Sequence, residues 1–460
     1  MPWASTVRLD DHQVGGYINT QAAAKSTGHL RLYKHDSTFG TMSRTPTSPM
    51  GRIVPRKVAG LISDALADTR VVLVNGARQT GKSTLVSSVC RDRAGEWRNL
   101  DRALERAAAH ADPVEFIQSD GLMVIDEIQR QPDLLLAIKA SVDEDPRPGR
   151  FLLTGSARVL GLRGLPDALP GRMDTIELWP LSQGEIDGTG ERFIDAVFDR
   201  STPFSHTSTL ARSDYIERLC RGGYPEAVAR EGARRDRFYD NYVSDLINRD
   251  VVQLSEIERG REMRTLTRLL AARSGQLLMP HKLAGELGIT GPTVARYVGL
   301  LEEVFLVKRL PAWSRNLSSR AVSAPKVAMV DSGIAANLLG QNPRRLARPE
   351  SPLGGLLEGF VAMELARQLE WSSTRAELFH YRTRDGVEVD LVLEERSGEV
   401  VAMDVKASST VRAEDFRGIR HLKERLGPDF VAGCVLHTGQ ETRSFGDGLW
   451  AIPISAIWEV

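Results

Sequence analysis

The stretch from Gly76 to Thr84 constrains this chain more than any other, because it carries the spacing G-x-x-x-x-G-K-S. Before it, the apolar run at 71–74 predicts a buried parallel strand, and the residues after it predict a helix. A loop between a strand and a helix points backbone N–H groups and the positive end of the helix dipole at an anion. The pattern therefore predicts a phosphate-binding loop, and a glycine-rich turn without a ligand is the weaker alternative.

Each residue type in this loop has a chemical reason. Gly76 and Gly81 carry no side chain that would keep the backbone away from a polyphosphate. Lys82 is predicted to lie along the β- and γ-phosphates, and the Ser83 hydroxyl is predicted to ligate Mg²⁺. The predicted cofactors are therefore ATP and Mg²⁺. The predicted nucleotide-binding residues are Gly76, Gln79, Thr80, Gly81, Lys82, Ser83 and Thr84.

A second strand brings acidic residues to the same place. The apolar residues at 122–125 predict a buried strand that ends in Asp126 and Glu127. On a parallel sheet its carboxyl end lies beside the phosphate-binding loop, so we expect Asp126 to hold Mg²⁺ through water. Glu127 can then polarise a water molecule that attacks the γ-phosphate. The alternative is that the two acids only cap the following helix.

A third strand, predicted at 151–153, ends in Thr154 and Ser156. A hydroxyl at this position can sense the γ-phosphate or hold the attacking water, although Thr and Ser also occur at such turns for local reasons. Arg172 follows this strand and is predicted to reach the γ-phosphate bound by a neighbouring subunit. The alternative is an exposed arginine in an ion pair.

The composition bounds the class of protein. With 460 residues the chain is long enough for about two to four domains. Its 60 basic and 60 acidic residues cancel, so the net charge gives no argument for nucleic-acid or membrane binding. Cys90, Cys220 and Cys434 are far apart, which argues against a zinc site or a disulfide framework. Because no apolar run approaches the roughly 18 residues of a membrane span, we expect a cytoplasmic protein without a membrane partner.

Changes of pattern divide the chain into segments. Residues 1–50 lack periodicity and are predicted to be a disordered extension. The alternation of strands and helices in residues 51–180 predicts an α/β domain built on a parallel sheet. The remaining predictions are a helical linker at 181–255 with a flexible insertion at 187–212, a winged helix-turn-helix at 256–312 and a C-terminal α/β domain at 313–460.

The winged helix-turn-helix is predicted from a change of period. Gly288 ends one predicted helix, a second runs from Pro292 to Glu303, and a strand follows at once. DNA is therefore a candidate partner. From His281 to Arg320, however, the chain has six Lys or Arg and three Glu, which is only a small excess of positive charge. This charge favours the alternative of a surface for packing or for another partner.

Several segments together resemble a known family: GARQTGKST, LMVIDEIQ, LLTGS, PGR, GGYPEAV, PKVAMVDSG, LLEGFVAMEL and GVEVDLVL followed by DVK. Residues 51–460 are similar to bacterial and archaeal AAA-type ATPases that join a P-loop ATPase domain to a C-terminal domain of unknown function with a restriction-endonuclease-like core. The resemblance implies nucleotide binding at Gly76, Gly81, Lys82, Ser83 and Thr84, and hydrolysis at Asp126 and Glu127.

The C-terminal domain holds a second set of charged residues. Glu358 and Glu364 lie on a predicted helix, Asp390 lies in a predicted strand, and Asp404 and Lys406 end the next strand. They resemble the PD-(D/E)XK nuclease signature, in which two carboxylates bind a divalent metal and a lysine activates the attacking water. The alternative is a charged strand face in contact with solvent.

The register of these two strands predicts a metal site. They are joined by a turn centred on Ser397, and Asp390 and Asp404 are each seven residues from that centre. In an antiparallel pair with this register the two acids face each other, so their repulsion has to be offset. A divalent cation such as Mg²⁺ or Mn²⁺ could do so, and so could Lys406 alone. A shift of one residue would separate the two acids.

Two functions fit these residues. The first is an AAA-type ATPase whose ATP hydrolysis is coupled to a nuclease-like domain that acts on DNA. The second is a nucleotide-dependent regulatory switch whose C-terminal domain binds a partner without catalysis. The candidate partners are DNA, a second copy of the chain, and a protein that the sequence does not identify.

Overall fold

The computed structural model describes residues 48–91, 93–156, 169–201, 204–251 and 260–460. All of them belong to one of the chain's two compact units, Thr38–Val460. The extension predicted at 1–50 lies outside the described residues except for its last three, 48–50.

The first sheet is parallel, as the alternating pattern of the sequence predicts. Its order is β2 (Gly95–Asn99), β3 (Leu122–Asp126), β4 (Phe151–Gly155), β1 (Val71–Asn75) and β5 (Met173–Glu177). The helical elements of this region are α1 (Ala59–Asp68), α2 (Lys82–Val89), α3 (Ala103–Ala111), α4 (Pro113–Phe116), the 3₁₀ turn η1 (Ile128–Arg130) and α5 (Leu134–Glu144).

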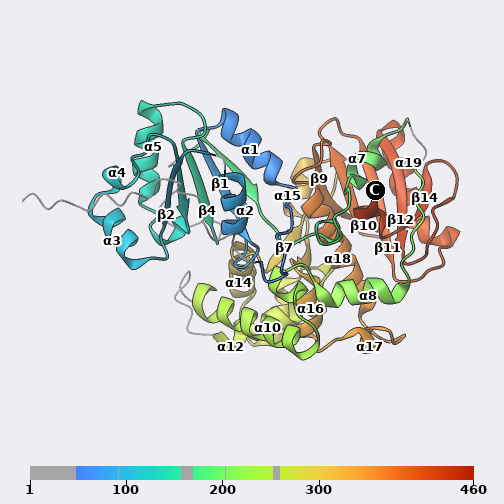
Figure 1. Ribbon diagram of the computed structural model, residues 1–460. Coiled ribbons are helices and arrows are strands. Elements are labelled where there is room, and N and C mark those ends of the chain that lie inside the picture. The colour runs from blue at the N-terminus through green and yellow to red at the C-terminus, as the bar shows by residue number, and fades with distance from the viewer. Residues whose placement is uncertain (1–47, 92, 157–168, 202–203, 252–259) are drawn as a thin grey trace, which may run out of the picture. The chain divides into compact units, whose positions relative to one another are not determined.

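The three central strands β1, β3 and β4 are buried and mostly apolar because helices cover both faces of the sheet (Figure 1). In β1, Val71 and Leu73 pack in the apolar cluster that includes residues of α3, α4 and α5. Val72 and Val74 point the other way and pack with residues of α1 and α2, such as Ile62. The carboxyl ends of the parallel strands consequently meet at one edge of the sheet, where the predicted site lies.

The middle region is mainly helical. Its helices are α6 (Gln183–Asp187), α7 (Phe193–Phe198), α8 (Arg212–Arg221), α9 (Pro225–Val228), α10 (Gly232–Asp245), the π-helix η3 (Leu246–Val251), α12 (Gly260–Ala272), α13 (Pro280–Leu287) and α14 (Gly291–Glu303). A small antiparallel sheet of order β6 (Gln276–Leu277), β8 (Lys326–Met329) and β7 (Val307–Leu310) follows. Since β8 comes after residue 312, this sheet extends past the boundary predicted there.

The prediction of a flexible insertion at 187–212 is wrong for residues 193–198. Residues Phe193–Phe198 form α7, and the side chains of Phe193, Ile194 and Val197 are buried in the apolar cluster that also contains Trp458. The spacing of these three residues puts them on one face of a helix. The polar residues on both sides hid this short apolar face from the sequence analysis.

The C-terminal region is built on a mixed sheet of order β13 (Arg443–Ser444), β14 (Leu449–Pro453), β12 (Phe430–His437), β11 (Val400–Lys406), β10 (Glu388–Glu395) and β9 (Ala376–Arg382). The pairs β9–β10 and β10–β11 are antiparallel, whereas β11–β12 and β12–β14 are parallel. The helical elements are α15 (Leu317–Val322), α16 (Ser332–Leu338), α17 (Pro343–Leu346), α18 (Leu353–Gln368), η4 (Ala413–Phe416), α19 (Arg417–Leu426), η5 (Gly427–Asp429) and α20 (Ala456–Glu459).

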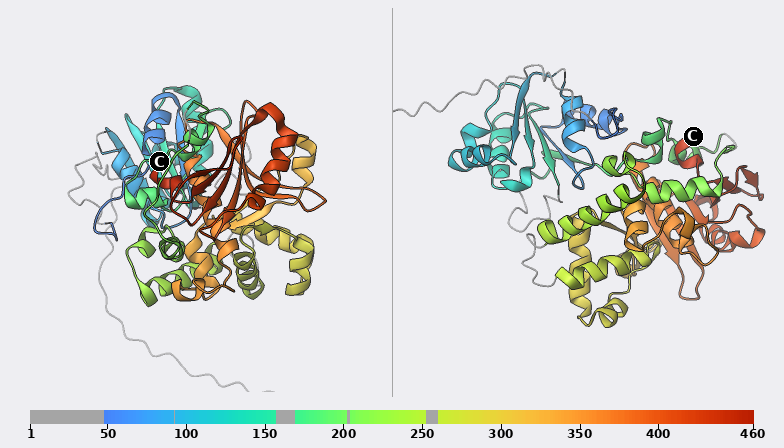
Figure 2. Two further views of the ribbon diagram at one scale, coloured as in Figure 1. Left: turned by 90° about the vertical axis from the view of Figure 1, so that its right-hand side faces the viewer. Right: turned by 60° about the horizontal axis from the view of Figure 1, so that its bottom comes forward.

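Helices cover both faces of this second sheet. Leu357 of α18 packs in one apolar cluster with Leu393 of β10, and Ile419 of α19 packs in another with Val392. Both views of Figure 2 show the twisted strands of this sheet in orange and red. Within the described residues, no helix is both long and apolar enough to cross a membrane. The three cysteines are free, in agreement with their spacing.

Buried carboxyl groups make the stability of this fold depend on pH. Burial raises the pKa of Glu191 to about 8, and the charge of nearby Glu364 adds to this shift. Burial also raises the pKa of Glu370 to about 7. In an unfolded chain a glutamate has a pKa of about 4.3, so each of these two side chains binds more protons in the folded state between about pH 4 and its raised pKa. Their contribution to stability therefore falls as the pH rises through this window.

We expect the melting temperature to be higher at about pH 5.5 than at about pH 8.5, because ionising these buried groups opposes folding. Glu191→Gln, an uncharged substitute for the protonated side chain, should lose part of this dependence in calorimetry. The control Glu414→Gln, at a side chain that is 74% exposed, should keep all of it. A wild-type melting temperature that rises over this range would contradict the prediction.

Candidate functional site

The loop between β1 and α2 has the conformation that its two glycines allow. Gly81 has φ 94° and ψ 24°, a left-handed conformation that disfavours any other residue. A Cβ at Gly76 would lie 2.2 Å from the carbonyl oxygen of Leu178, so this position has no room for a side chain. The two glycines are thus required for different reasons, one by its backbone angle and one by a close neighbour.

Lys82 is buried at the start of α2, inside the curve of the loop. Its Nζ donates to the carbonyl oxygens of Gly76 at 2.9 Å and Ala77 at 2.8 Å. Burial lowers the pKa of Lys82 to about 8, although the negative charges of Glu127 and Asp126 oppose this shift. Both of these hydrogen-bond acceptors are uncharged, so a phosphate oxygen in their place would form a stronger, charge-assisted bond.

Asp126 connects the ends of several strands. Its carboxylate accepts from Ser83 Oγ at 3.0 Å, from Asn99 Nδ2 at 3.5 Å and from Thr154 Oγ1. Burial raises the pKa of Asp126, although the hydroxyl of Thr154 counteracts the shift. The structure thus brings together Ser83 and Asp126, the two residues predicted to hold Mg²⁺. Hydroxyl and carboxylate oxygens are ligands that suit this cation.

Glu127 is held by residues at the end of β4. Its backbone is left-handed, with φ 63° and ψ 48°, which is uncommon for a residue with a side chain. Ser156 Oγ lies 2.8 Å from both carboxylate oxygens of Glu127, and Gln129 Nε2 also donates to this carboxylate. The Glu127 N–H donates to Thr154 Oγ1 at 3.1 Å. Thr154 and Ser156 therefore hold the two acids, and their predicted part in sensing the γ-phosphate stays a prediction.

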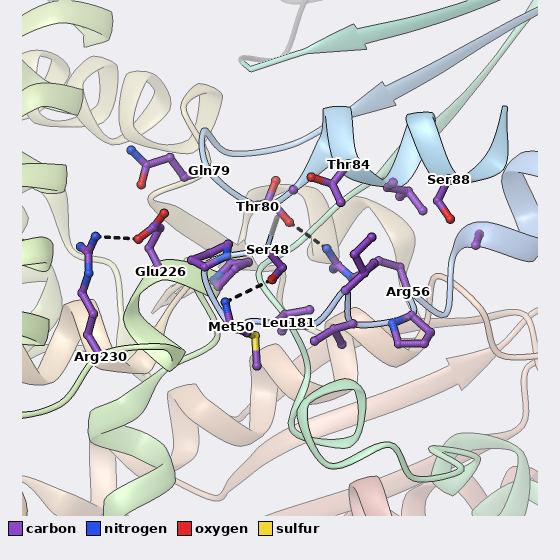
Figure 3. Close-up of a pocket in the computed structure, with 18 of the residues that line it drawn as sticks. Ser48, Met50, Arg56, Gln79, Thr80, Thr84, Ser88, Leu181, Glu226 and Arg230 are labelled. Atoms are coloured by element: carbon purple, nitrogen blue, oxygen red, sulfur yellow. Dashed lines mark hydrogen bonds and ion pairs between the residues drawn. The ribbon is translucent and has the colours of Figure 1, made fainter. Parts of the chain in front are cut away.

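A cavity of about 600 Å³ adjoins the loop (Figure 3). This is the size of pocket that takes a drug-sized ligand. Its wall includes Gln79, Thr80, Gly81, Thr84 and Ser88 from the loop and α2; Ile53, Val54 and Arg56 from the chain before α1; and Leu181, Pro225, Glu226, Arg230 and Phe238 from the middle region. Of these residues the sequence analysis predicted only Gln79, Thr80, Gly81 and Thr84, because most of the others come from distant segments.

Arg56 is a residue of this wall that the sequence analysis missed. Its guanidinium donates to the carbonyl oxygen of Thr80 at 2.9 Å (Figure 3). It also donates to the carbonyl oxygen of Trp179 at 2.7 Å and forms an ion pair of 3.0 Å with Glu185. These contacts hold the chain before α1 against the phosphate-binding loop. No motif surrounds Arg56 in the sequence, so its position could be found only from the fold.

Arg172 pairs within its own chain. It forms a two-pronged ion pair with Asp143 of α5 and also donates to the Pro170 carbonyl oxygen at 3.1 Å. The hydrogen bond from Arg172 lowers the pKa of Asp143. In this structure Arg172 thus has the ion pair that the sequence analysis named as the alternative, and its action on a neighbouring subunit stays a prediction.

The second set of predicted residues lies where β10 and β11 separate. Leu391 pairs with Met403 and Val392 with Ala402, which is the predicted register and puts Asp390 opposite Asp404. The Asp390 N–H donates to Asp404 Oδ1 at 3.0 Å, and the Val405 N–H donates to Asp390 Oδ2 at 3.0 Å. The two carboxylates therefore take the place of carbonyl oxygens at the end of the ladder.

Lys326 of β8 supplies positive charge to this cluster, and the sequence analysis did not find it. Its Nζ lies 2.6 Å from Glu358, 2.8 Å from Glu388 and 3.2 Å from Asp390, and its side chain is 1% exposed. Burial lowers the pKa of Lys326, but Glu358 and Asp390 outweigh burial, so the net shift is upward. Burial raises the pKa of Glu358 to about 8, and the charge of Asp390 adds to this shift.

Of the residues predicted for a nuclease site, Glu364 lies elsewhere. Glu364 pairs with Arg367 at 2.6 Å and accepts from the Gln183 N–H at 2.9 Å, so it joins α18 to the middle region. Lys406 Nζ lies 4.0 Å from Asp415 Oδ1. Among the described residues, no group of three or more His, Cys, Asp or Glu side chains could hold a metal ion. The structure therefore brings together Glu358 and Asp390 around a lysine, and Asp404 contacts the backbone of Asp390.

Comparisons with known proteins agree with the description of the first sheet and its phosphate-binding loop. Family models match an AAA domain at residues 68–187 and domains of unknown function, DUF8612 and DUF4143, at 212–345 and 353–457. The uncharacterized protein Rv2008c of Mycobacterium tuberculosis is 30% identical over 87% of this chain and 84% of its own. An uncharacterized protein of Haemophilus influenzae is 21% identical over 67% of this chain and 72% of its own.

Solved structures include a Walker-type ATPase, PABY2304 of Pyrococcus abyssi. It is 14% identical, with a TM-score of 0.40, and the match covers 65% of this chain and 99% of that one.

We predict that Lys326→Gln destabilises the protein by about 3–5 kcal/mol, because it leaves the buried carboxylates without their cation. The control Arg382→Gln removes a partly exposed partner of Glu388, 2.8 Å away, and should cost at most about 1 kcal/mol. Both values come from denaturant unfolding. If Mn²⁺ raises the melting temperature of the wild type but Lys326→Gln costs no more than the control, the cluster is a metal site and the prediction is wrong.

Proposed function

This chain belongs to the same protein family as Rv2008c of Mycobacterium tuberculosis, and on that premise we propose that it is a Mg²⁺-dependent ATPase whose nucleotide state is a switch for its C-terminal domain. The chain contains an AAA domain, for which ATP is the expected ligand. The observation that carries the proposal is the contact between Ser83 and Asp126 beside the phosphate-binding loop, with Glu127 next in the chain.

Each residue of the site has one task in the proposed reaction. The backbone of the loop and Lys82 bind the phosphates, and the cavity beside the loop takes the nucleoside. Ser83 and Asp126 hold Mg²⁺, which neutralises phosphate charge when it is bound. Glu127 orients the attacking water. Ser156 holds the Glu127 carboxylate in one orientation, so little reorganisation is needed before that water is activated.

A switch is better supported than a nuclease by the charges around Asp390. Lys326 already contacts Asp390, one of the two aspartates predicted to bind a divalent metal, and also Glu358. The Nζ of Lys406, which should activate water in a nuclease, lies 4.0 Å from Asp415 Oδ1. A DNA-directed nuclease remains the alternative function, and cleavage of plasmid DNA by the wild type in Mn²⁺ would favour it.

We infer that residues 260–329 fold as a winged helix that acts as a packing module. The order α12, β6, α13, α14, β7 and β8 supports this topology. The segment between β7 and β8, the wing, contacts the C-terminal sheet: Ala312 bridges to His380, and Arg320 pairs with Glu394. Arg296 is the only Lys or Arg in α14, which gives DNA little to bind.

We expect Lys82→Ala to abolish ATP binding, because it removes a contact made to the phosphates before the reaction starts. Glu127→Gln should keep ATP binding and lose about 10²-fold or more in kcat, because it affects only the chemical step. Titration with a fluorescent nucleotide measures the first effect, and phosphate release measures the second.

Matched controls are Lys139→Ala and Glu115→Gln, on helices α5 and α4, which should behave as the wild type. Equal losses of nucleotide affinity in Lys82→Ala and Glu127→Gln would refute the separate roles of these two residues.

Arg172 tests whether a second copy of the chain takes part in ATP hydrolysis. If Arg172 acts on a neighbouring subunit, the ATPase rate per subunit rises with protein concentration, and Arg172→Ala lowers kcat with little change in KM. Asp143→Ala is the control, because it breaks the same ion pair but keeps the arginine. A rate per subunit that stays constant on dilution assigns Arg172 to the ion pair alone.

A further inference from the structure

Tyr242 of α10 contacts the phosphate-binding loop from outside. Its hydroxyl donates to the carbonyl oxygen of Arg78 at 3.2 Å, and its side chain is buried. The loop has further contacts of this kind: Lys82 donates to the carbonyl oxygens of Gly76 and Ala77, and Arg56 donates to that of Thr80. Backbone groups of the loop are thus held by side chains from three different segments.

These contacts respond differently to a bound phosphate. Two of the three N–H donors of Lys82 Nζ go to the carbonyl oxygens of Gly76 and Ala77, so a phosphate would compete with these oxygens for the ammonium group. Arg56 and Tyr242 lie outside the loop and can stay in place. A phosphate that competes for Lys82 therefore leaves the shape of the loop more dependent on these two side chains.

The hydroxyl of Tyr242 is also part of a directed chain of hydrogen bonds. Tyr224 Oη lies 3.0 Å from Tyr242 Oη, and the two rings are 4.7 Å apart. A tyrosine hydroxyl has a single proton, and that of Tyr242 goes to the Arg78 carbonyl oxygen. Tyr224 is consequently the donor between the two hydroxyls. Both side chains are buried, where hydrogen bonds in series strengthen one another.

The backbone just before Tyr224 is anchored to Asp331. The Gly223 N–H donates to Asp331 Oδ2 at 2.7 Å, and Asp331 Oδ1 accepts from the Ile334 N–H at 3.0 Å, which caps helix α16. On its other side, a Cβ at Gly223 would lie 2.1 Å from the carbonyl oxygen of Leu181, a residue of the cavity wall. Gly223 is thus held from two sides. A shift of Tyr224 must therefore also move the hydrogen bond between the Gly223 N–H and Asp331.

We propose that Tyr242 is a positioning residue of the phosphate-binding loop, and that Tyr224 and Tyr242 transmit the occupancy of the loop to Asp331 and helix α16. The inference rests on the proposed nucleotide binding and adds the route by which the rest of the chain senses it. Helix α16 packs against α8, α10, α12 and α18, so a change at Asp331 reaches both domains of unknown function.

The first test measures nucleotide affinity. Tyr242→Phe keeps the ring and removes the donor, so we expect the Kd of both ADP and ATP to rise about three- to tenfold, with KM following and kcat nearly unchanged. Tyr224→Phe should have a smaller effect. In the double variant, Tyr224→Phe should add nothing to Tyr242→Phe, since the chain is already broken.

Tyr215→Phe is the matched control, because its buried hydroxyl accepts from the Ser455 N–H at 3.3 Å, away from the loop. This variant should lose similar stability and bind nucleotide as the wild type does. A melting temperature that falls in Tyr242→Phe while its Kd stays at the wild-type value shows a merely structural role and overturns the proposal.

The second test follows transmission by hydrogen exchange at the Gly223 and Ile334 amides, which donate to Asp331. Saturating ADP should slow exchange at both amides in the wild type and in Tyr215→Phe, but not in Tyr242→Phe. The same slowing in Tyr242→Phe overturns the proposal. If the wild type binds neither ADP nor ATP, the proposed function fails with it, whereas wild-type binding with an unaffected Tyr242→Phe refutes only the tyrosine route.

Discussion

The structure depends first on the parallel register of the strands in the first sheet. Val74 pairs with Thr154, and Asn99 pairs with Asp126, so the chain leaves these strands at the same edge. This alignment lets one hydroxyl, that of Thr154, contact both Asp126 and the N–H of Glu127. The site is a consequence of strand pairing, because no single segment carries more than a part of it.

In the C-terminal sheet, negative charges lie close together and need a compensating cation. The register of β10 and β11 places two aspartates opposite each other, and neighbouring glutamates add to the negative charge. Lys326 comes from the small sheet of the middle region and compensates part of it. Burial with excess negative charge also raises the pKa of Asp404 to about 7. Lys326 thus joins the small sheet of the middle region to the C-terminal sheet through ion pairs.

Buried polar contacts also join the AAA domain to the rest of the chain. Tyr242 reaches the phosphate-binding loop, Arg367 donates to the Pro180 carbonyl oxygen at 3.0 Å, and Glu364 accepts from the Gln183 N–H. A buried polar group without a hydrogen-bond partner costs about 1–3 kcal/mol. Breaking one of these contacts is therefore unfavourable unless another partner takes its place. Such contacts can transmit a change, because movement on one side cannot be absorbed without breaking a bond.

The sequence by itself determined the features that depend on spacing along the chain. The loop from Gly76 to Thr84, the acids after β3 and the hairpin that places Asp390 opposite Asp404 all follow from local periodicity, which the backbone converts directly into position. Tertiary structure alone decided the partners of these residues. Arg56 and Tyr242 lie in no motif, and Lys326 lies in the segment PKVAMVDSG, whose pattern gives no sign of its partners. Their contacts arise because packing brings distant segments within hydrogen-bond distance.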